Sequence, residues 1–380
     1  MAAKEDMRSS NDVGAQGASA IFEKLGSNGS GRGPLGSGRR SVFGALDLGT
    51  NNCRLLVATP NAKGFRVIDA FSRIVRLGEG LASHGYLAEA AIERTIEALK
   101  ICAAKLGRRQ ATRTRSVATE ACRLAENRSE FVDRVRDETG IALDIISPAE
   151  ESRLAVLGCR ALFDPNAQYF LVFDIGGGST EMTCVERLPN NHLRILDWLS
   201  LPIGVVRLSE EAGTDRWTSK TFSGAAGLVR TELERFRSGL GLSGELDSGR
   251  VQLIGSSGTV TTLASVALGL ERYDRTKVDG SSIKSRKMQE MAREICALSD
   301  EERAAMPCIG PDRADLLVPG CTILESILNA WPIDKITIAD RGIREGILRG
   351  LMSNDSSGQV IMAVDAGTHK PSAVNEETVL

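Results

Sequence analysis

The sequence is poor in the features that mark zinc proteins, secreted proteins and membrane proteins. It has three histidines, far apart, and none of its eight cysteines stands in a C-x-x-C pair. A zinc site is therefore not expected, and the cysteines are predicted to be buried, reduced thiols. No apolar run approaches the roughly 18 residues that cross a bilayer, and no secretory signal begins the chain. These absences predict a cytoplasmic protein with no membrane partner.

The chain also has little net charge. Its 47 basic and 49 acidic residues give a formal charge of −2, so no overall field attracts nucleic acid or anionic lipid, and nucleic acid is not an expected partner. Any anionic ligand must be held locally. With 380 residues, 42% of them apolar, the chain has the composition of a globular protein and length for about two domains.

Strands and helices alternate along the middle of the chain, which is typical of an α/β fold. Strands are expected near residues 42–46, 54–58, 65–71, 114–118 and 143–146, and helices over 87–106, 121–139, 149–162 and 316–331. Residues 1–40, rich in glycine, serine and arginine, are predicted to be a disordered arm. Residues 353–380 are predicted to be a loose tail, in which a short strand near 360–364 is one option.

The middle of the chain contains one strand-and-turn pattern twice. An apolar strand runs into an acidic, glycine-containing turn twice: Asp47-Leu48-Gly49-Thr50-Asn51-Asn52, and then Asp174-Ile175-Gly176-Gly177-Gly178-Ser179-Thr180. The two aspartates lie 127 residues apart, a spacing typical of duplicated domains. The repeat predicts two similar α/β domains facing one another across a cleft, at 41–148 and 149–340. A helix is expected over residues 341–352, and it is an option for completing the first domain.

These turns have the composition of phosphate-binding loops. Glycine lets the backbone approach a ligand, a hydroxyl and N–H groups can face phosphate, and the carboxylate can hold a hydrated cation. A third turn leads from a short strand into a helix, whose free N–H groups suit an anion, through Ser256, Ser257, Gly258 and Thr259. Neither a Walker nor a Rossmann pattern is present. A polar hairpin or an ordinary N-cap would explain one such turn, but three favour a shared phosphate site.

Together these segments resemble the exopolyphosphatase and guanosine pentaphosphate phosphohydrolase family. The resemblance spans roughly residues 42–352 and also includes Gly204 and the stretch Arg341-Gly342-Ile343-Arg344-Glu345-Gly346; its most specific part is the triple-glycine turn ending in Glu181. It implies a duplicated actin-like, ribonuclease H-like α/β fold in a short, two-domain form. It also implies release of terminal orthophosphate from polyphosphate or guanosine pentaphosphate, with Mg²⁺ or another divalent cation. Members are often homodimers, and the residues leave the oligomeric state open.

The resemblance also implies roles for single residues. Glu151 matches the catalytic carboxylate and Glu181 its partner, with Asp47, Asp174 and Glu181 as candidate cation ligands. The residues alone would favour Glu151 as a solvated residue of a helix's first turn, and neighbouring Glu150 is an alternative; Glu120 ranks second among the acids and Arg344 is a further basic candidate. The predicted phosphate-binding residues are Gly49, Thr50, Asn51, Asn52, Arg54, Arg123, Gly176, Gly177, Gly178, Ser179, Thr180, Ser256, Ser257, Gly258 and Thr259.

Two other functions stay open at this stage. The same fold would serve an actin-like or sugar-kinase-like ATPase or phosphotransferase, although no adenosine-binding segment is recognisable. A non-catalytic sensor of polyphosphate or of an alarmone nucleotide is the third option. The presence of both Glu151 and Glu181 favours hydrolysis over a sensor. Since long family members carry additional C-terminal helical domains, a short member is expected to prefer short chains or to act less processively.

Overall fold

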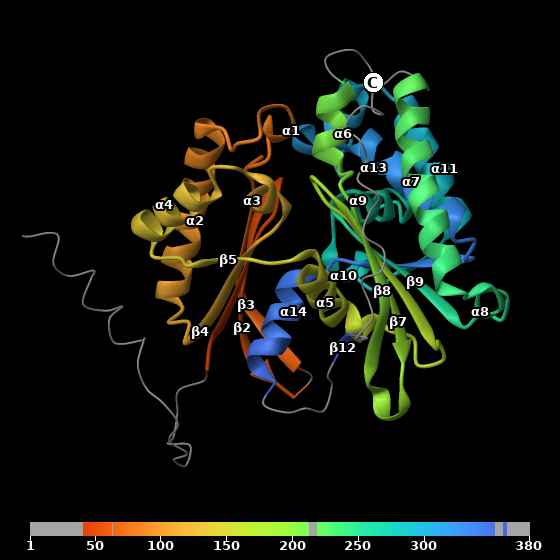
Figure 1. Cartoon of the computed structure of the whole chain (residues 1–380), viewed down its shortest axis with the longest axis horizontal. Helices are drawn as coiled ribbons and strands as arrows, with labels where there is room; N and C mark the ends of the chain where they lie inside the picture. Colours follow the sequence, from red (N-terminus) through yellow and green to blue (C-terminus); the bar gives the residue numbers. More distant parts are fainter. Residues whose placement is uncertain (1–40, 63, 213–218, 354–359, 363–380) are drawn as a thin grey trace, which may run out of the picture. The chain divides into compact units, whose positions relative to one another are not determined.

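Two mixed β-sheets with helices on their faces make up the described part of the chain. The computed structural model describes residues 41–62, 64–212, 219–353 and 360–362. The predicted N-terminal arm and most of the predicted C-terminal tail lie outside these residues. Figure 1 labels the elements that follow.

Sheet A is built from the first third of the chain and has the strand order β3-β2-β1-β4-β5. Its strands are β1 (Phe43–Leu48), β2 (Asn52–Asn61), β3 (Gly64–Ile74), β4 (Arg113–Ala118) and β5 (Leu143–Ile145). β1, β2 and β3 pair antiparallel, whereas β4 and β5 run parallel to β1. The helices between them are α1 (Leu81–His84), α2 (Glu89–Arg108), α3 (Glu120–Leu124) and α4 (Arg128–Thr139).

Sheet B has the order β10-β11-β9-β6-β7-β8-β12. Its strands are β6 (Tyr169–Ile175), β7 (Thr180–Arg187), β8 (Leu193–Leu201), β9 (Val251–Ser256), β10 (Ser282–Lys284), β11 (Lys335–Ala339) and β12 (Val360–Met362). The last of these is the optional strand of the C-terminal segment, and it pairs parallel to β8. Between the strands lie α6 (Val205–Ala212), α7 (Ser219–Leu240), α8 (Ser243–Asp247), α9 (Gly258–Ala267), α10 (Arg275–Val278), α11 (Ser285–Ala297), α12 (Asp300–Ala305) and α13 (Pro311–Ala330), with single 3₁₀ turns at Arg160–Leu162 and Pro189–Asn191.

The two sheets repeat one topology. The order β8-β7-β6-β9-β11 in sheet B matches β3-β2-β1-β4-β5 in sheet A, with two antiparallel pairs followed by two parallel pairs in both. Equivalent hairpins are displaced by 127 residues, so that Asp47 pairs with Arg54 where Asp174 pairs with Glu181. The predicted duplicated actin-like α/β fold is confirmed.

Two helices cross between the sheets, α5 (Pro148–Cys159) and α14 (Ile343–Met352), as Figure 1 shows. α14 packs on sheet A, where Ile347 and Leu348 join a core with Phe43 and Ala45. α5 turns Val156 and Cys159 into a core on sheet B. We call sheet A with α1–α4 and α14 lobe I, and sheet B with α5–α13 lobe II.

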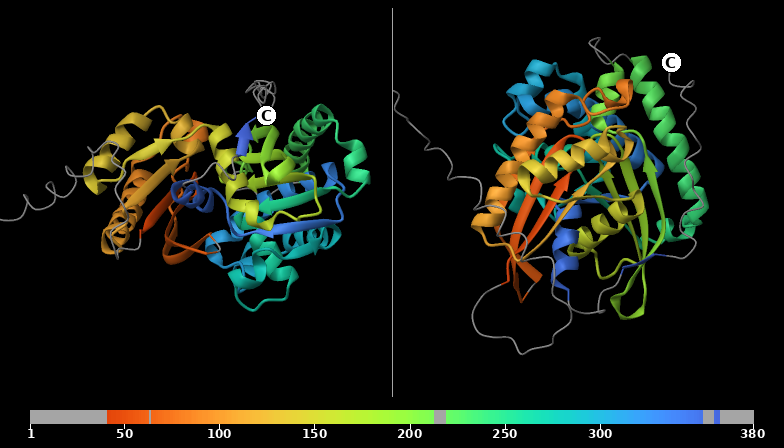
Figure 2. Two further views of the ribbon diagram at one scale, coloured as in Figure 1. Left: turned by 90° about the horizontal axis from the view of Figure 1, so that it is seen from below. Right: turned by 60° about the vertical axis from the view of Figure 1, so that its left-hand side comes forward.

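Glycines allow the two crossing helices to touch backbone to backbone. A Cβ on Gly158 would lie 2.0 Å from the carbonyl oxygen of Gly342, and one on Gly346 would lie 2.0 Å from that of Leu154. Neither contact leaves room for a methyl group. On the outer faces, α2 and α4 cover sheet A while α7, α9 and α13 cover sheet B, which Figures 1 and 2 show from three sides.

Two predicted helices differ from the structure. The helix expected over 121–139 is divided into α3 and α4, because Asn127 turns its side chain to the backbone of Leu87 (Oδ1 to N, 2.9 Å) at the break. The helix expected over 316–331 begins at Pro311, and Pro319 lies inside it. A proline at the first helical position is a start signal, which the prediction overlooked in favour of the second proline.

Within the ranges that the structure describes, no helix combines the length and the apolar character needed to span a membrane. All eight cysteines are described; each is unpaired, and seven are buried. The prediction of buried thiols is confirmed for those seven, and Cys296 is partly exposed.

Candidate active site

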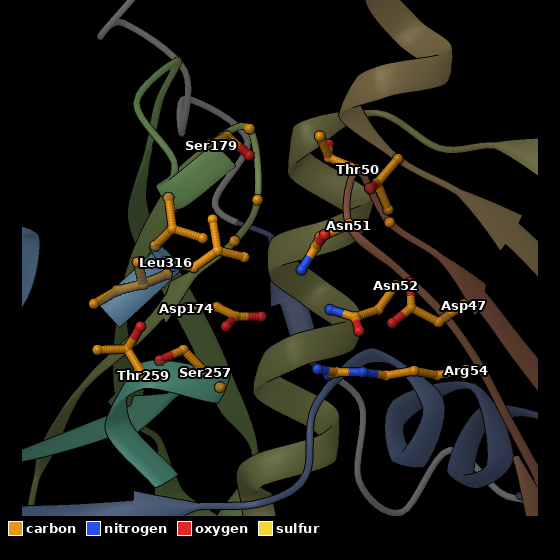
Figure 3. A pocket seen from close by; sticks show the side chains of 18 of the residues that line it. Asp47, Thr50, Asn51, Asn52, Arg54, Asp174, Ser179, Ser257, Thr259 and Leu316 are labelled. Carbon is orange, nitrogen blue, oxygen red and sulfur yellow. The ribbon is translucent and has the colours of Figure 1, made fainter. Parts of the chain in front are cut away.

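A pocket lies between the lobes, where the repeated hairpin turns face one another. Lobe I contributes Asp47, Gly49, Thr50, Asn51, Asn52, Arg54, Ile74, Thr119 and Ile343. Lobe II contributes Glu151, Asp174, Ile175, Gly176, Gly177, Gly178, Ser179, Glu181, Val205, Ser257, Gly258, Thr259, Thr262, Arg313, Leu316 and Leu317. Figure 3 shows Asp174 and Ser179 on one wall and Asp47, Asn51 and Arg54 on the other.

The two hairpins close with the same bond. In the first, the Gly49 amide donates to the Asn52 carbonyl at 2.9 Å; in the second, the Gly176 amide donates to the Ser179 carbonyl at 2.8 Å. Each turn therefore presents its intervening residues towards the pocket. Such successive N–H groups form a concavity that suits an anion.

Packing between the lobes limits two of the three glycines in the second turn. A Cβ on Gly178 would lie 1.9 Å from the Oε2 atom of Glu120, and one on Gly177 would lie 3.1 Å from the Cβ atoms of Thr50 and Asn51. All three neighbours belong to lobe I. The turn thus brings the lobes into close contact, whereas the sequence prediction explained the glycines by the ligand alone.

The third predicted turn opens α9. Ser257 caps this helix by accepting a hydrogen bond from the Val260 amide at 2.9 Å, and Gly258 and Thr259 follow at the pocket wall. A helix N-terminus carries partial positive charge and unpaired amides, which favours an anionic ligand. Gly320 of α13 lets the helices pack closely, since its Cβ would lie 2.1 Å from Thr259 Oγ1.

Glu151 faces the pocket from the first turn of α5 and is 9% exposed. Arg123 donates from Nη1 to Glu151 Oε2 at 2.7 Å and to the carbonyl of Ile146 at 3.0 Å, which fixes the carboxylate in place. Burial raises the pKa of Glu151 to about 8, with repulsion from Glu181 adding to it and Arg123 opposing it. A carboxylate that faces a pocket and is held in place by an arginine is suited to accept a proton from a water bound there.

Glu181 is a second buried carboxylate in the same pocket. The hydroxyls of Ser179 and Ser200 both donate to its Oε1 atom, the latter at 3.1 Å. Burial raises its pKa to about 8, against the effect of Ser179. The two serines therefore orient this carboxylate while the protein interior disfavours its charge.

The aspartates near the ends of β1 and β6 are half-buried. Burial raises the pKa of Asp174 to about 7 and raises that of Asp47, in both cases against the attraction of Arg54. Four carboxylates thus share one pocket in which their charge is disfavoured. Carboxylate oxygens are hard ligands of the kind Mg²⁺ takes, so this donor set fits a divalent cation that substrate oxygens and water help to hold. Among the residues described, no three His, Cys, Asp or Glu side chains form a metal cluster by themselves.

Three of the predicted phosphate-binding residues do not line the pocket, since their side chains have other partners. Arg123 holds Glu151. The Thr180 hydroxyl donates to the carbonyl of Ile203 at 2.7 Å, and that of Ser256 donates to the carbonyl of Arg341 at 3.1 Å. All other predicted phosphate-binding residues line the pocket, as do the predicted cation ligands and both glutamates.

Several lining residues escaped the sequence-based prediction. The clearest is Arg313, in the first turn of α13, whose Nη1 atom donates to Thr262 Oγ1 at 3.3 Å. The Gly310-Pro311 helix start was a usable signal, because side chains just after such a start flank the amide-rich end of a helix. The apolar residues Leu316 and Leu317 gave no signal, since their spacing is that of any buried helix.

Comparisons with known proteins agree with this geometry. The family model described as the Ppx/GppA phosphatase family matches residues 56–355. The chain is 32% identical over 321 residues to Exopolyphosphatase 2 of Mycobacterium tuberculosis, covering 81% of this chain and 97% of that one. A crystal structure of the Aquifex aeolicus Ppx/GppA family member has a TM-score of 0.68 at 28% identity, covering 84% of this chain and all of that one. An exopolyphosphatase from Cytophaga hutchinsonii shares the fold, with a TM-score of 0.69 at 24% identity and coverages of 84% and 100%.

Fold and site therefore define a two-lobed, actin-like protein with a pocket between its lobes that is lined by glycine-containing turns and acidic side chains. The extent of these matches identifies its family. The chain belongs to the Ppx/GppA phosphatase family.

Proposed function

We propose that the protein is an exopolyphosphatase, which releases the terminal orthophosphate of inorganic polyphosphate by hydrolysis. The observation on which this rests is the position of Glu151, a buried carboxylate held by Arg123 in a pocket walled by three anion-type turns. The name of the Mycobacterium tuberculosis relative supports the same reaction.

The reaction needs a water aligned with the terminal phosphorus. Glu151 accepts a proton from this water as the water oxygen bonds to phosphorus, and the bond from phosphorus to the bridging oxygen breaks. Orthophosphate and a chain shorter by one unit result. Arg54, the turn amides and the start of α9 bind the oxygens of the terminal phosphate, and Glu181, fixed by Ser179 and Ser200, helps to orient the water.

A divalent cation completes the proposal. Asp47, Asp174 and Glu181 would hold Mg²⁺, partly through water, and the bound ion would neutralise charge on the phosphate oxygens. The raised pKa values of these three carboxylates and of Glu151 support a role for a cation, because placing four negative charges in one pocket is unfavourable without one.

The test is orthophosphate release with Mg²⁺ from polyphosphate, guanosine pentaphosphate and ATP, offered separately. Glu151→Gln should lower kcat at least about 100-fold, the contribution typical of a general base. Glu150→Gln is the matched control, because Glu150 is held by Arg115 and Arg153 and does not line the pocket; its kcat should stay within about threefold. Turnover of ATP alone would favour a kinase-like enzyme, and tight binding without turnover a sensor.

A further inference from the structure

Two contacts join the lobes beside the pocket, through the segment between β3 and α1, residues 75–80. Arg76 donates from Nη2 to Asp315 Oδ2 of α13 at 3.0 Å, and the Gly80 amide donates to Glu210 Oε1 of α6 at 2.9 Å. Ile74, just before this segment, and Leu316, next to Asp315, both line the pocket. The ion pair therefore lies at the rim where the two walls meet.

On the side of lobe I, this segment is bonded directly to the first phosphate turn. The amides of Val75 and Arg76 donate to the carbonyl of Asn51 at 2.8 and 3.0 Å, and the amide of Gly78 donates to that of Thr50 at 2.9 Å. The segment has no space to slide past the turn, since a Cβ on Gly78 would lie 2.3 Å from Thr50 Cγ2. A displacement of residues 75–80 would therefore displace Thr50 and Asn51.

On the side of lobe II, Asp315 lies in the part of α13 that forms the pocket wall. Arg313 precedes it by two residues, and Leu316 follows it. The ion pair thus connects the turn that offers amides to a phosphate with the helix that offers an arginine. Their separation is set in part by this contact.

The geometry of both partners is unusual. Arg76 has a φ of +48°, in the left-handed region that side chains other than glycine adopt at a cost. The other oxygen of its partner, Asp315 Oδ1, is buried and accepts no hydrogen bond from the described residues. A strained backbone at a contact between lobes is a feature that supports a hypothesis of function.

We infer that Arg76 and Asp315 are positioning residues, which form a latch that holds the first phosphate turn against the Arg313 wall when substrate is bound. Both side chains are 41% exposed, so the pair is weak enough to open and close in each catalytic cycle. Breaking it shifts the lobes towards the open state and weakens binding of the phosphate chain. The kinetic part of this inference rests on the proposed hydrolase function.

Four variants test the latch. Arg76→Asn removes the charge but tolerates the left-handed φ, and Asp315→Asn removes the partner charge. Each should raise KM for polyphosphate about two- to fivefold, as expected for an exposed ion pair, with kcat unchanged or higher. The double variant should be no worse than either single one, and the swapped pair Arg76→Asp with Asp315→Arg should return KM to within about twofold. The control is Arg293→Gln, which removes an ion pair with Glu325 of α13, the helix that also carries Asp315. It should change neither KM nor kcat.

Amide hydrogen exchange gives a readout that does not depend on activity. Val75, Arg76 and Gly78, whose amides bond to the first turn, should exchange faster in both single variants and recover in the swapped pair. If no variant and no wild-type protein releases phosphate, the proposed function fails while the exchange result still decides the latch. Additive effects on KM, a swapped pair that does not recover, or unchanged exchange would each overturn it. A KM effect of Arg76→Asn without one of Asp315→Asn would assign Arg76 to direct substrate contact instead.

Discussion

Two neighbouring glutamates at the start of α5 have opposite surroundings. Glu150 accepts hydrogen bonds from Arg115 and Arg153, which outweigh its burial and lower its pKa. Glu151 has one arginine, Arg123, and burial raises its pKa to about 8. Sequence alone could not decide which of the two glutamates is the catalytic candidate. The structure distinguishes them, because only Glu151 lines the pocket.

Arg123→Met should therefore lower kcat about 10- to 100-fold with KM within about threefold, because Glu151 loses the group that orients it rather than a group that binds substrate. Arg115→Met, which removes the equivalent partner of Glu150, is the matched control and should leave kcat within about twofold. Steady-state phosphate release decides between them. A large rise in KM in Arg123→Met would instead support the sequence prediction that Arg123 binds phosphate.

The site was predictable where one short segment repeats. Asp47 and Asp174, with the turns that follow, share a pattern whose second copy made a chance match improbable. Arg313 and Leu316 were not predictable in this way, because they reach the pocket through the packing of α13 against the other helices of lobe II. Such contacts join residues far apart in the chain, such as Arg313 and Thr262, which are 51 positions apart, and the repeated pattern does not record them.

At the scale of elements, strand β3 is joined to the end of α2 by one carboxylate. Asp69 accepts hydrogen bonds from Lys105 Nζ at 2.6 Å and Arg109 Nε at 2.9 Å, and these two bonds lower its pKa below the usual value. A carboxyl group whose pKa is lower in the folded state stabilises the fold above its unfolded pKa, near 3.8, and loses that effect as the pH falls further.

Asp69→Asn should accordingly lower the melting temperature at pH 7, and the difference from wild type should shrink as the pH falls below about 4. Thermal unfolding followed between pH 7 and pH 3 measures it. Asp133→Asn, which removes an exposed pair with Arg136, is the control and should have little effect at any pH. A difference that grows towards low pH would contradict a lowered pKa for Asp69 in the folded protein.

The crossing of α5 and α14 gives a second prediction for elements. Gly346→Ala should destabilise the protein by about 1–3 kcal/mol or more, because its Cβ would meet the carbonyl of Leu154 at 2.0 Å. Gly350→Ala, in the same helix, would place no described residue within 4 Å of its Cβ and should be neutral or stabilise by up to about 1 kcal/mol. Denaturant unfolding of both variants tests the contact, and equal effects would refute it.

At the scale of the molecule, the two lobes share one topology but contribute different charges to the pocket. Where lobe I has Arg54 beside Asp47, lobe II has Glu181 beside Asp174. The Arg54 guanidinium of one lobe and the Glu181 carboxylate of the other thus line the same pocket from equivalent positions of the two sheets. The duplication was predictable from the repeated pattern, whereas this difference in charge became meaningful only once the structure showed both residues at one pocket.

Binding of Mg²⁺ should be visible in the stability of the whole protein. At about 100 times its Kd, a ligand that binds only the folded state adds about 2.7 kcal/mol, so MgCl₂ should raise the melting temperature by several degrees. Asp174→Asn should not lose stability in EDTA, because it removes a buried charge, and it should abolish most of the Mg²⁺-dependent rise. An equal rise in this variant would exclude Asp174 as a ligand.

The packing of α14 on sheet A also has a consequence for the synthesis of the protein. The face of sheet A formed by Phe43 and Ala45 is covered by Ile347 and Leu348 of α14, about 300 residues later in the chain. Since a ribosome delivers the chain from its N-terminus, the first lobe emerges with that face bare and keeps it so while the second lobe is synthesised. Completion of this core thus waits for α14, the last helix of the described residues, and at about 5–20 residues per second the apolar sheet face stays open to chaperones for tens of seconds.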